Sequence, residues 1–356
     1  MAFELVAQLA AFTSGPARAA LDAGKPWVRE VRRLAGRDLL RRVERYDLGI
    51  YAQLATVALE SDPPRDAAAL VHALGGMEPR ALQLRLLGAD SQLNQTMVSD
   101  GAFERAVAGE PGARRELLTE LAGNGAGRNA MRRVLDASPV ELRNMIAGIV
   151  REWATSVLPA FADAAWSVIE RDAEGTSAAI ASRSPAAVIS LVTNGVTYEP
   201  PRWITSMVVV PTVALRPFVI PVELRGTAIF VYSVSDDALG TDASAPPRRL
   251  VKVAAALGDE LRLRILRAIG DEELSATEVA ERLGVDRTTI HHHLGILRSA
   301  GLLAIRDEGE RGWRYARRPD ALALTEELET YVADRRRSPS TIASGARRRR
   351  GGPPPT

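Results

Sequence analysis

A capped helix followed by a glycine turn and a second helix is the feature that most constrains the fold of this chain. Ser275-Ala276-Thr277-Glu278 has the spacing of a capping box, in which the Ser hydroxyl and the Glu carboxylate each accept a hydrogen bond from the other residue's backbone N–H. We therefore expect a helix to begin at Ser275, with Val279 on its apolar face and Gly284 permitting a sharp turn. Asp286 then has the position of a cap for the second helix.

The second helix has an apolar face and a polar face. Ile290, Leu294 and Leu297 recur at intervals of four and three, so we expect them to face a core. The other side carries polar or small residues, namely Arg287, Thr288, His291, His292, Gly295 and Arg298. Gly301 ends this helix, and residues 302–306 and 313–317 predict a hairpin around a charged turn. Helix, turn, helix and hairpin in this order are typical of a winged helix-turn-helix, which lays one helix in the DNA major groove.

Two motifs in this segment resemble those of the ArsR family of bacterial transcription regulators. The first is Asp259-Glu260-Leu261-Arg262-Leu263-Arg264-Ile265-Leu266. The second is Thr288-Thr289-Ile290-His291-His292-His293-Leu294-Gly295-Ile296-Leu297-Arg298-Ser299-Ala300-Gly301-Leu302. The resemblance covers about a quarter of the chain. It implies a winged-helix fold, binding to double-stranded DNA, and a homodimer held partly by a terminal helix, for which Leu322, Leu324, Leu328 and Tyr331 supply a partial apolar stripe.

The candidate site is the polar side of the second helix together with the hairpin, or wing. The match to the family pattern implies base or phosphate contacts from the helix, with Arg suited to guanine, and positive charge on the wing suits phosphates. The expected DNA-binding residues are Arg287, Thr288, Thr289, His291, His292, Arg298, Arg306, Arg311 and Arg314. We expect His293 to pack toward the preceding helix instead.

Metal, cofactor and catalytic sites are not expected. Successive helical residues lie about 100° apart, so three consecutive histidines cannot converge on one ion. The chain has no Cys, and it lacks the Cys pair of metal-sensing ArsR members. The glycine-rich segment 123–127 follows a predicted helix rather than a strand, so a turn between helices explains it better than a cofactor loop. His72, the one His outside 291–293, has apolar neighbours, and we expect no enzyme activity.

Length and composition limit the number of domains that the chain can form and the partners that it can bind. With 356 residues, it is long enough for two or three domains, and its longest apolar runs are interrupted, so we expect a cytoplasmic protein without membrane contact. The net charge is +2, but residues 335–356 hold seven Arg and no acid, leaving 39 basic and 44 acidic residues elsewhere. Affinity for nucleic acid must therefore be local.

The predicted fold class is mainly α with a small β region. Residues 1–180 read as roughly seven or eight helices of unknown role, and residues 185–235 as a small sheet packed on them, with strands at 188–192, 207–210 and 229–234. A linker at 236–249 precedes the winged helix-turn-helix with its C-terminal helix, 250–334. The Arg-rich tail, 335–356, cannot bury a core, and we expect it to be disordered.

These features favour a homodimeric transcription regulator, expected to be a repressor, that binds a pseudo-palindromic operator. A regulator needs an input, and we expect a small-molecule effector in the N-terminal region, where Trp27, Trp153, Trp166 and Trp203 either line a cavity or form core. Two alternatives stay open. One is an enzyme with a fused DNA-binding domain, and the other is a protein-interaction protein whose winged helix binds another protein.

Overall fold

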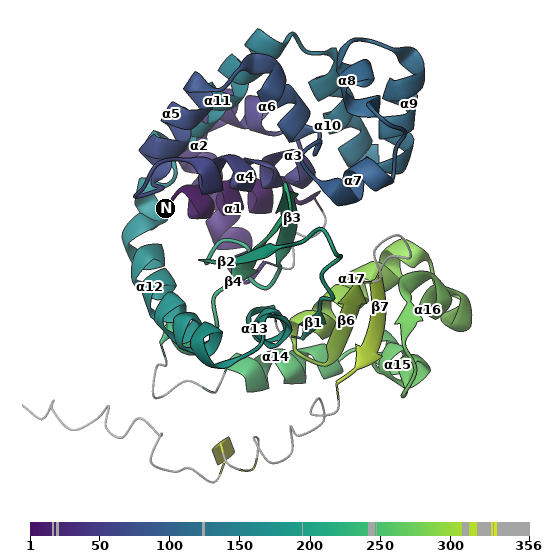
Figure 1. Cartoon of the computed structure of the whole chain (residues 1–356). Coiled ribbons are helices and arrows are strands. Elements are labelled where there is room, and N and C mark those ends of the chain that lie inside the picture. The colour runs from purple at the N-terminus through teal and green to yellow at the C-terminus, as the bar shows by residue number, and fades with distance from the viewer. Residues whose placement is uncertain are drawn as a thin grey trace, which may run out of the picture.

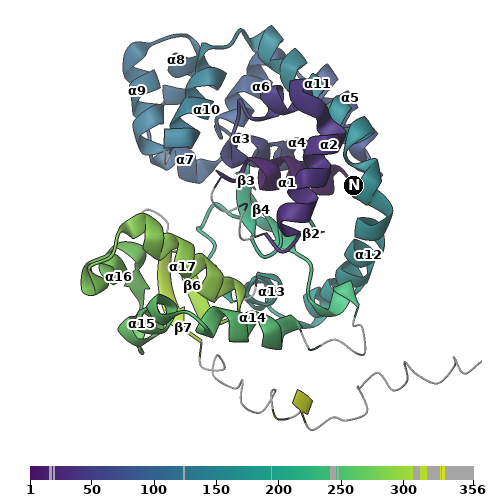
Figure 2. The same ribbon diagram turned by 180° about the vertical axis from the view of Figure 1, so that it is seen from behind.

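Figures 1 and 2 show a computed structural model of the chain, which describes residues 1–15, 18, 21–122, 125–193, 195–240, 246, 248–307, 313–318, 329, 331 and 332. Helices dominate these residues, and two small sheets accompany them. The predicted fold class, mainly α with a small β region, is confirmed. In both views the helices of the first half form one mass, and α15, α16, α17 and the wing strands form a second, smaller one.

The N-terminal helices are arranged around α1 (Ala2–Thr13), of which all but two residues are buried. It contacts α2, α3, α4, α5 and α11. The remaining helices of this part are α2 (Gly24–Val43), α3 (Leu48–Ala52), α4 (Leu54–Glu60), α5 (Ala67–Gly76), α6 (Pro79–Leu86), α7 (Gln92–Thr96), α8 (Ala102–Val107), α9 (Pro111–Glu120), α10 (Gly125–Asp136), α11 (Pro139–Ser156) and α12 (Pro159–Ser182). The described residues thus hold more helices than the seven or eight predicted, because several helices are too short for periodicity to separate.

Three side chains with polar groups, those of Trp153, Gln8 and Glu4, are buried inside this helical core. Trp153 is fully buried, and its indole N–H donates to Gln8 Oε1 at 3.0 Å. Glu4 is 3% exposed, and its Oε2 accepts from the backbone N–H of Val213 at 2.9 Å. Burial raises the pKa of Glu4 to about 7. Of the tryptophans considered for a cavity, Trp27 is also buried, while Trp166 is 45% exposed.

The glycine-rich segment and the region after α12 test two local predictions. Helix α9 precedes the glycine-rich segment, so the prediction that a helix rather than a strand comes before it is confirmed. Residues 125–127 already belong to α10, and residues 123 and 124 lie outside the described part of the chain. The strand predicted at 188–192 is wrong, because these residues belong to helix α13 (Pro185–Val192). Ser184 caps this helix by accepting from the N–H of Ala187 at 3.3 Å, and Pro185 occupies its first turn. The cap and proline outweigh the β-branched composition.

A three-stranded sheet packs beside the helical core, in the order β2-β4-β3. Its strands are β2 (Ser206–Thr212), β3 (Ile220–Leu224) and β4 (Thr227–Ser233). A tight turn at Arg225 and Gly226, both with positive φ, joins β3 to the antiparallel β4. Ile229 and Val231 face the helical core, whereas Phe230 faces α13 through Ile189, so β4 is buried on both sides.

The C-terminal part is built from α14 (Arg248–Leu257), α15 (Glu260–Ile269), β5 (Leu274–Ser275), α16 (Ala276–Leu283), α17 (Arg287–Ser299), β6 (Leu303–Asp307) and β7 (Trp313–Arg317). Its sheet has the order β1-β6-β7-β5, and β1 (Val196–Thr197) comes from the region before the predicted linker. Strand β1 runs parallel to β6, and Ile305 N–H donates to Gly195 O at 3.2 Å. Backbone hydrogen bonds therefore attach the wing to the N-terminal part.

The predicted terminal helix and the Arg-rich tail, 335–356, lie outside the described residues, apart from residues 329, 331 and 332 of the former. The same holds for residues 241–245 and 247 of the predicted linker. Among the residues that are described, no helix is both long enough and apolar enough to cross a membrane.

Candidate nucleic-acid interface

The turn between α16 and α17 has the predicted geometry. Ser275 N–H donates to Glu278 Oε2 at 2.6 Å, and Glu278 N–H donates to Ser275 Oγ at 3.2 Å, which completes the capping box. Gly284 ends α16 in the left-handed conformation, with φ 64°. Asp286 then accepts from the N–H of Thr289 at 3.3 Å, in the first turn of α17. Local hydrogen bonds thus fix both ends of the turn.

The apolar face of α17 is fully packed. Ile290, Leu294 and Leu297 are each 0% exposed, as predicted. They share one core cluster with Ile265 of α15 and Val279 of α16. Because these contacts come from both neighbouring helices, the rotation of α17 about its own axis is fixed, and so is the direction of its opposite face.

The opposite face of α17 is open to solvent over its first two turns. Arg287, Thr289, His291 and His292 are exposed, while the side chain of Thr288 lies outside the described atoms. Arg287 Nε donates to His291 Nε2 at 3.4 Å. Burial and the nearby Arg287 charge lower the pKa of His291, which keeps its ring neutral at pH 7 and able to accept this hydrogen bond. The guanidinium is thereby oriented on the exposed face.

His293 turns away from this face. Its Nδ1 lies 3.8 Å from Asp259 Oδ1 and has no hydrogen-bond partner among the described residues. Asp259 caps α15 by accepting from Arg262 N–H at 3.0 Å. His293 thus turns inward as predicted, but the charged group that it approaches is the cap of α15 rather than a residue of the preceding helix, α16. Among the described residues, no group of three or more His, Asp or Glu side chains is placed to hold a metal ion.

Arg298 does not lie on the solvent side, so this part of the site prediction is wrong. Its side chain belongs to the last turn of α17 and is only 8% exposed. The guanidinium carbon lies 5.9 Å from the ring centroid of Phe218, between β2 and β3, and burial lowers the pKa of Arg298. Helical spacing alone could not reveal this burial, because the N-terminal part supplies the covering residue.

The wing arginines are held by acidic side chains. Arg306 lies 3.3 Å from Glu273, and Arg314 lies 3.4 Å from Glu278 while it also donates to the backbone carbonyl of Glu273. Arg311 lies outside the described residues. Arg306 and Arg314, which are expected to contact phosphates, therefore also connect the wing to the residue before β5 and to α16.

One exposed side chain of the wing was missed. Trp313, the first residue of β7, is 38% exposed. The alternation of Trp, Arg and Tyr along this strand predicts a hairpin, and it also places Trp313 and Tyr315 on the same side of the strand, so it does not by itself predict that Trp313 is exposed. An aromatic side chain of this kind can pack against sugar or base surfaces.

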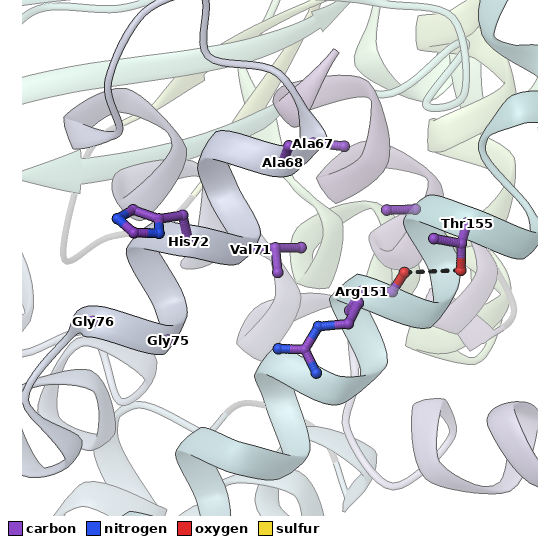
Figure 3. A pocket seen from close by; sticks show the side chains of 9 residues that line it. Ala67, Ala68, Val71, His72, Gly75, Gly76, Arg151 and Thr155 are labelled. Carbon is purple, nitrogen blue, oxygen red and sulfur yellow. Dashed lines mark hydrogen bonds between the residues drawn. The ribbon is translucent and has the colours of Figure 1, made fainter.

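A groove in the helical part contains His72, the one His outside α17. Figure 3 shows its walls, contributed by α5 and α11, with a volume of about 780 Å³. Small side chains dominate it, and the lining residues are Ala67, Ala68, Val71, His72, Gly75, Gly76, Arg151, Ala154 and Thr155. In Figure 3 Thr155 is hydrogen-bonded to the backbone of Arg151, at 3.2 Å. No carboxylate in the described part of the chain forms an ion pair with His72.

Two comparisons with known proteins agree with this geometry, whereas a comparison with the solved structures finds no match. The uncharacterized HTH-type transcriptional regulator YceK of Bacillus subtilis (strain 168) is 41% identical over 59 residues, which are 16% of this chain and 59% of that protein. The chain therefore matches less than two thirds of that relative's length. Residues 257–306 match the family described as helix-turn-helix domain. The C-terminal part of the chain thus contains a helix-turn-helix domain, within the winged arrangement of α15, α16, α17 and β5 to β7.

Proposed function

We propose that the protein is a sequence-specific DNA-binding regulator of transcription that uses α17 as its recognition helix. The observation that carries this proposal is the division of α17 into a fully buried face and an exposed face bearing Arg287, Thr289, His291 and His292. Such a helix, fixed in rotation by its core, can present its N-terminal side chains to base edges in a major groove.

The side chains of this face suit different parts of DNA. Arg287 can donate two hydrogen bonds to guanine O6 and N7, and the Thr and His side chains can donate or accept at base edges or phosphates. Arg306 and Arg314 of the wing form ion pairs with carboxylates of the protein. On DNA, each of them can bind a phosphate in place of its carboxylate. Arg287 therefore determines sequence preference, whereas the wing contributes affinity that depends on salt.

The proposed active form is a homodimer and the proposed action is repression, in the cytoplasm. Two copies of α17 would enter successive major grooves about 34 Å apart on a pseudo-palindromic operator. The resemblance to ArsR regulators and the printed name of the Bacillus relative support a regulatory role. This role requires no catalytic step.

Selection of duplexes from a random-sequence library by the full-length protein tests the proposal. We expect one enriched palindromic motif and binding that weakens steeply as salt rises. Binding to DNA with no sequence preference, or an interaction insensitive to salt, would instead favour a protein-interaction role.

Replacement of Arg287 tests the assignment of the recognition face. Arg287→Ala should weaken binding to the selected duplex by about 1–3 kcal/mol, or roughly 5- to 150-fold, and relax preference at one base pair. Arg32→Ala, at an exposed position of α2, is the matched control and should change neither affinity nor preference. Equal binding by the wild type and Arg287→Ala would show that another surface contacts the bases.

A further inference from the structure

A second cavity lies between the N-terminal part and the winged helix-turn-helix. Its volume is about 760 Å³, within the range of small-molecule sites. One side is formed by α12 and β4, which contribute Gly175, Thr176 and Tyr232. The other side includes Ser299, Ala300 and Gly301, at the C-terminal end of the recognition helix. A molecule in this cavity would therefore touch both parts of the protein.

A buried polar cluster forms part of the cavity wall. Asp172 is 5% exposed, and its two oxygens accept from Tyr232 O–H and from Ser235 N–H, each at 2.6 Å. Thr176 Oγ1 lies 2.9 Å from the Tyr232 hydroxyl. Burial and the hydrogen bond to Asp172 raise the pKa of Tyr232, so its phenol keeps its proton. The Asp172 carboxylate is thus already hydrogen-bonded within the protein.

A second group of charges in the wall is balanced internally. Arg216 is 5% exposed and lies 3.1 Å from Asp22, and it also pairs with Asp236. Lys252 of α14 lies 2.9 Å from Asp22 and 3.4 Å from Asp236. Two cations and two carboxylates therefore form one network with no net charge.

Outside this network, the guanidinium groups in and behind the cavity wall outnumber the carboxylates there by one. Arg171 lines it, donates Nε to Ala238 O at 2.9 Å, and forms no ion pair within the described part of the chain. Arg298 is buried behind the lining residue Phe218 and, among the described residues, also lacks an ion pair. Arg171 and Asp237 are both exposed, so water screens both of these charges. With Arg318, which also lines the cavity, the residues that the structure describes supply three guanidinium groups against the two carboxylates of Asp172 and Asp237. A buried cation without a carboxylate partner favours an anion nearby.

Another part of the lining is apolar. Its side chains are those of Leu191, Val192, Pro217, Phe218, Val219 and Val234. Apolar walls with a few convergent polar groups are typical of sites that bury the body of an organic ligand and orient its polar end. The combination of these walls with Arg171 fits a small organic anion that has an apolar body.

We propose that this cavity binds a small amphipathic organic anion, such as a carboxylate or phosphate ester on an apolar body, and is the effector site of the protein. Arg171 binds the acid group, and Phe218 packs against the apolar body. This inference rests on the proposed function as a DNA-binding regulator. A ligand that fits better in one position of the whole winged helix-turn-helix relative to the N-terminal part shifts the population toward that position and so changes the affinity for DNA.

The test uses the full-length protein and the fluorescent probe 1-anilinonaphthalene-8-sulfonate, an aromatic body with one anionic group. The uncharged N-phenyl-1-naphthylamine, which lacks the sulfonate, separates anion recognition from apolar binding. Arg171→Gln should weaken binding of the sulfonate by about tenfold and leave the uncharged probe unchanged. Arg32→Gln, at an exposed position of α2, should change the binding of neither probe.

Gly175→Phe should weaken binding of both probes, because the new ring occupies part of the cavity. Gly175 lies within α12, and a Cβ added there meets no atom within 4 Å, so the new side chain enters open space without backbone strain. Gly75→Phe is the matched control, since Gly75 lies in α5, is equally unobstructed, and lines the other groove. Circular dichroism of each variant verifies that the fold is retained.

The outcomes separate this inference from the proposed function. Weaker probe binding in Gly175→Phe but not in Gly75→Phe supports the site, and unaltered binding in Gly175→Phe overturns it. The sulfonate should change the affinity of the protein for the selected duplex. If it does, the duplex must change the affinity for the sulfonate by the same factor, because coupling between two binding sites is reciprocal. Equal probe affinity with and without duplex overturns the coupling. Failure of the wild type to select any duplex overturns the proposed function while leaving the probe titration interpretable.

Discussion

The pH dependence of stability tests how tightly the helical core encloses Glu4. Burial raises the pKa of this carboxyl from 4.5 to about 7. Because the folded protein then binds more protons than the unfolded chain between these values, stability falls as pH rises from about 4.5 through 7. The full shift corresponds to about 3 kcal/mol, of which about 2.5 kcal/mol falls between pH 5 and 8.

Glu4→Gln removes the titrating group and keeps an oxygen that can accept from Val213 N–H. The free energy of unfolding of the wild type, relative to the variant, should therefore fall by about 2.5 kcal/mol from pH 5 to pH 8. Urea unfolding followed by tryptophan fluorescence measures this difference, since Trp153 lies in the same core. Glu44→Gln removes an exposed carboxylate from the end of α2 and serves as the control. A constant difference between wild type and Glu4→Gln across this range would refute the argument that Glu4 is desolvated.

Three further substitutions test the packing around the site. Ser275→Ala removes the capping box and should lower the free energy of unfolding by about 1 kcal/mol, seen as a lower thermal midpoint. An unchanged midpoint would mean that the box is not formed in solution. Leu294→Ala should cost about 2–5 kcal/mol in urea unfolding and also weaken DNA binding, because the recognition helix loses its support. A variant as stable as the wild type would contradict the burial of Leu294. Tyr232→Phe leaves one oxygen of Asp172 without its donor and should cost about 1–3 kcal/mol in the same assay. No loss would show that water replaces the phenol there.

The sequence predicted those parts of the fold that local interactions determine. The box at Ser275, the turn at Gly284 and the three buried positions of α17 all depend on residues within a few turns of one another. Spacing along the chain was therefore sufficient to place the exposed face of α17.

Features that depend on distant segments could not be predicted in this way. Arg298 has polar spacing on α17 but is covered by Phe218, eighty residues earlier in the chain. Residues 188–192 have strand composition but form a helix that packs on β4. The cavity beside Gly175 needs residues of α12, α13, β4, α14 and α17 brought together by the whole fold, and no local pattern marks it.

The parallel pairing of β1 with β6 has a consequence for how the chain can be divided. A fragment that began at α14 would retain the recognition helix but would leave the backbone of β6 unpaired along one edge. Unpaired strand edges recruit other strands, so such a fragment is expected to self-associate or precipitate. The boundary of the DNA-binding unit therefore follows hydrogen bonding rather than sequence order, and it includes residues that lie about fifty positions before α14.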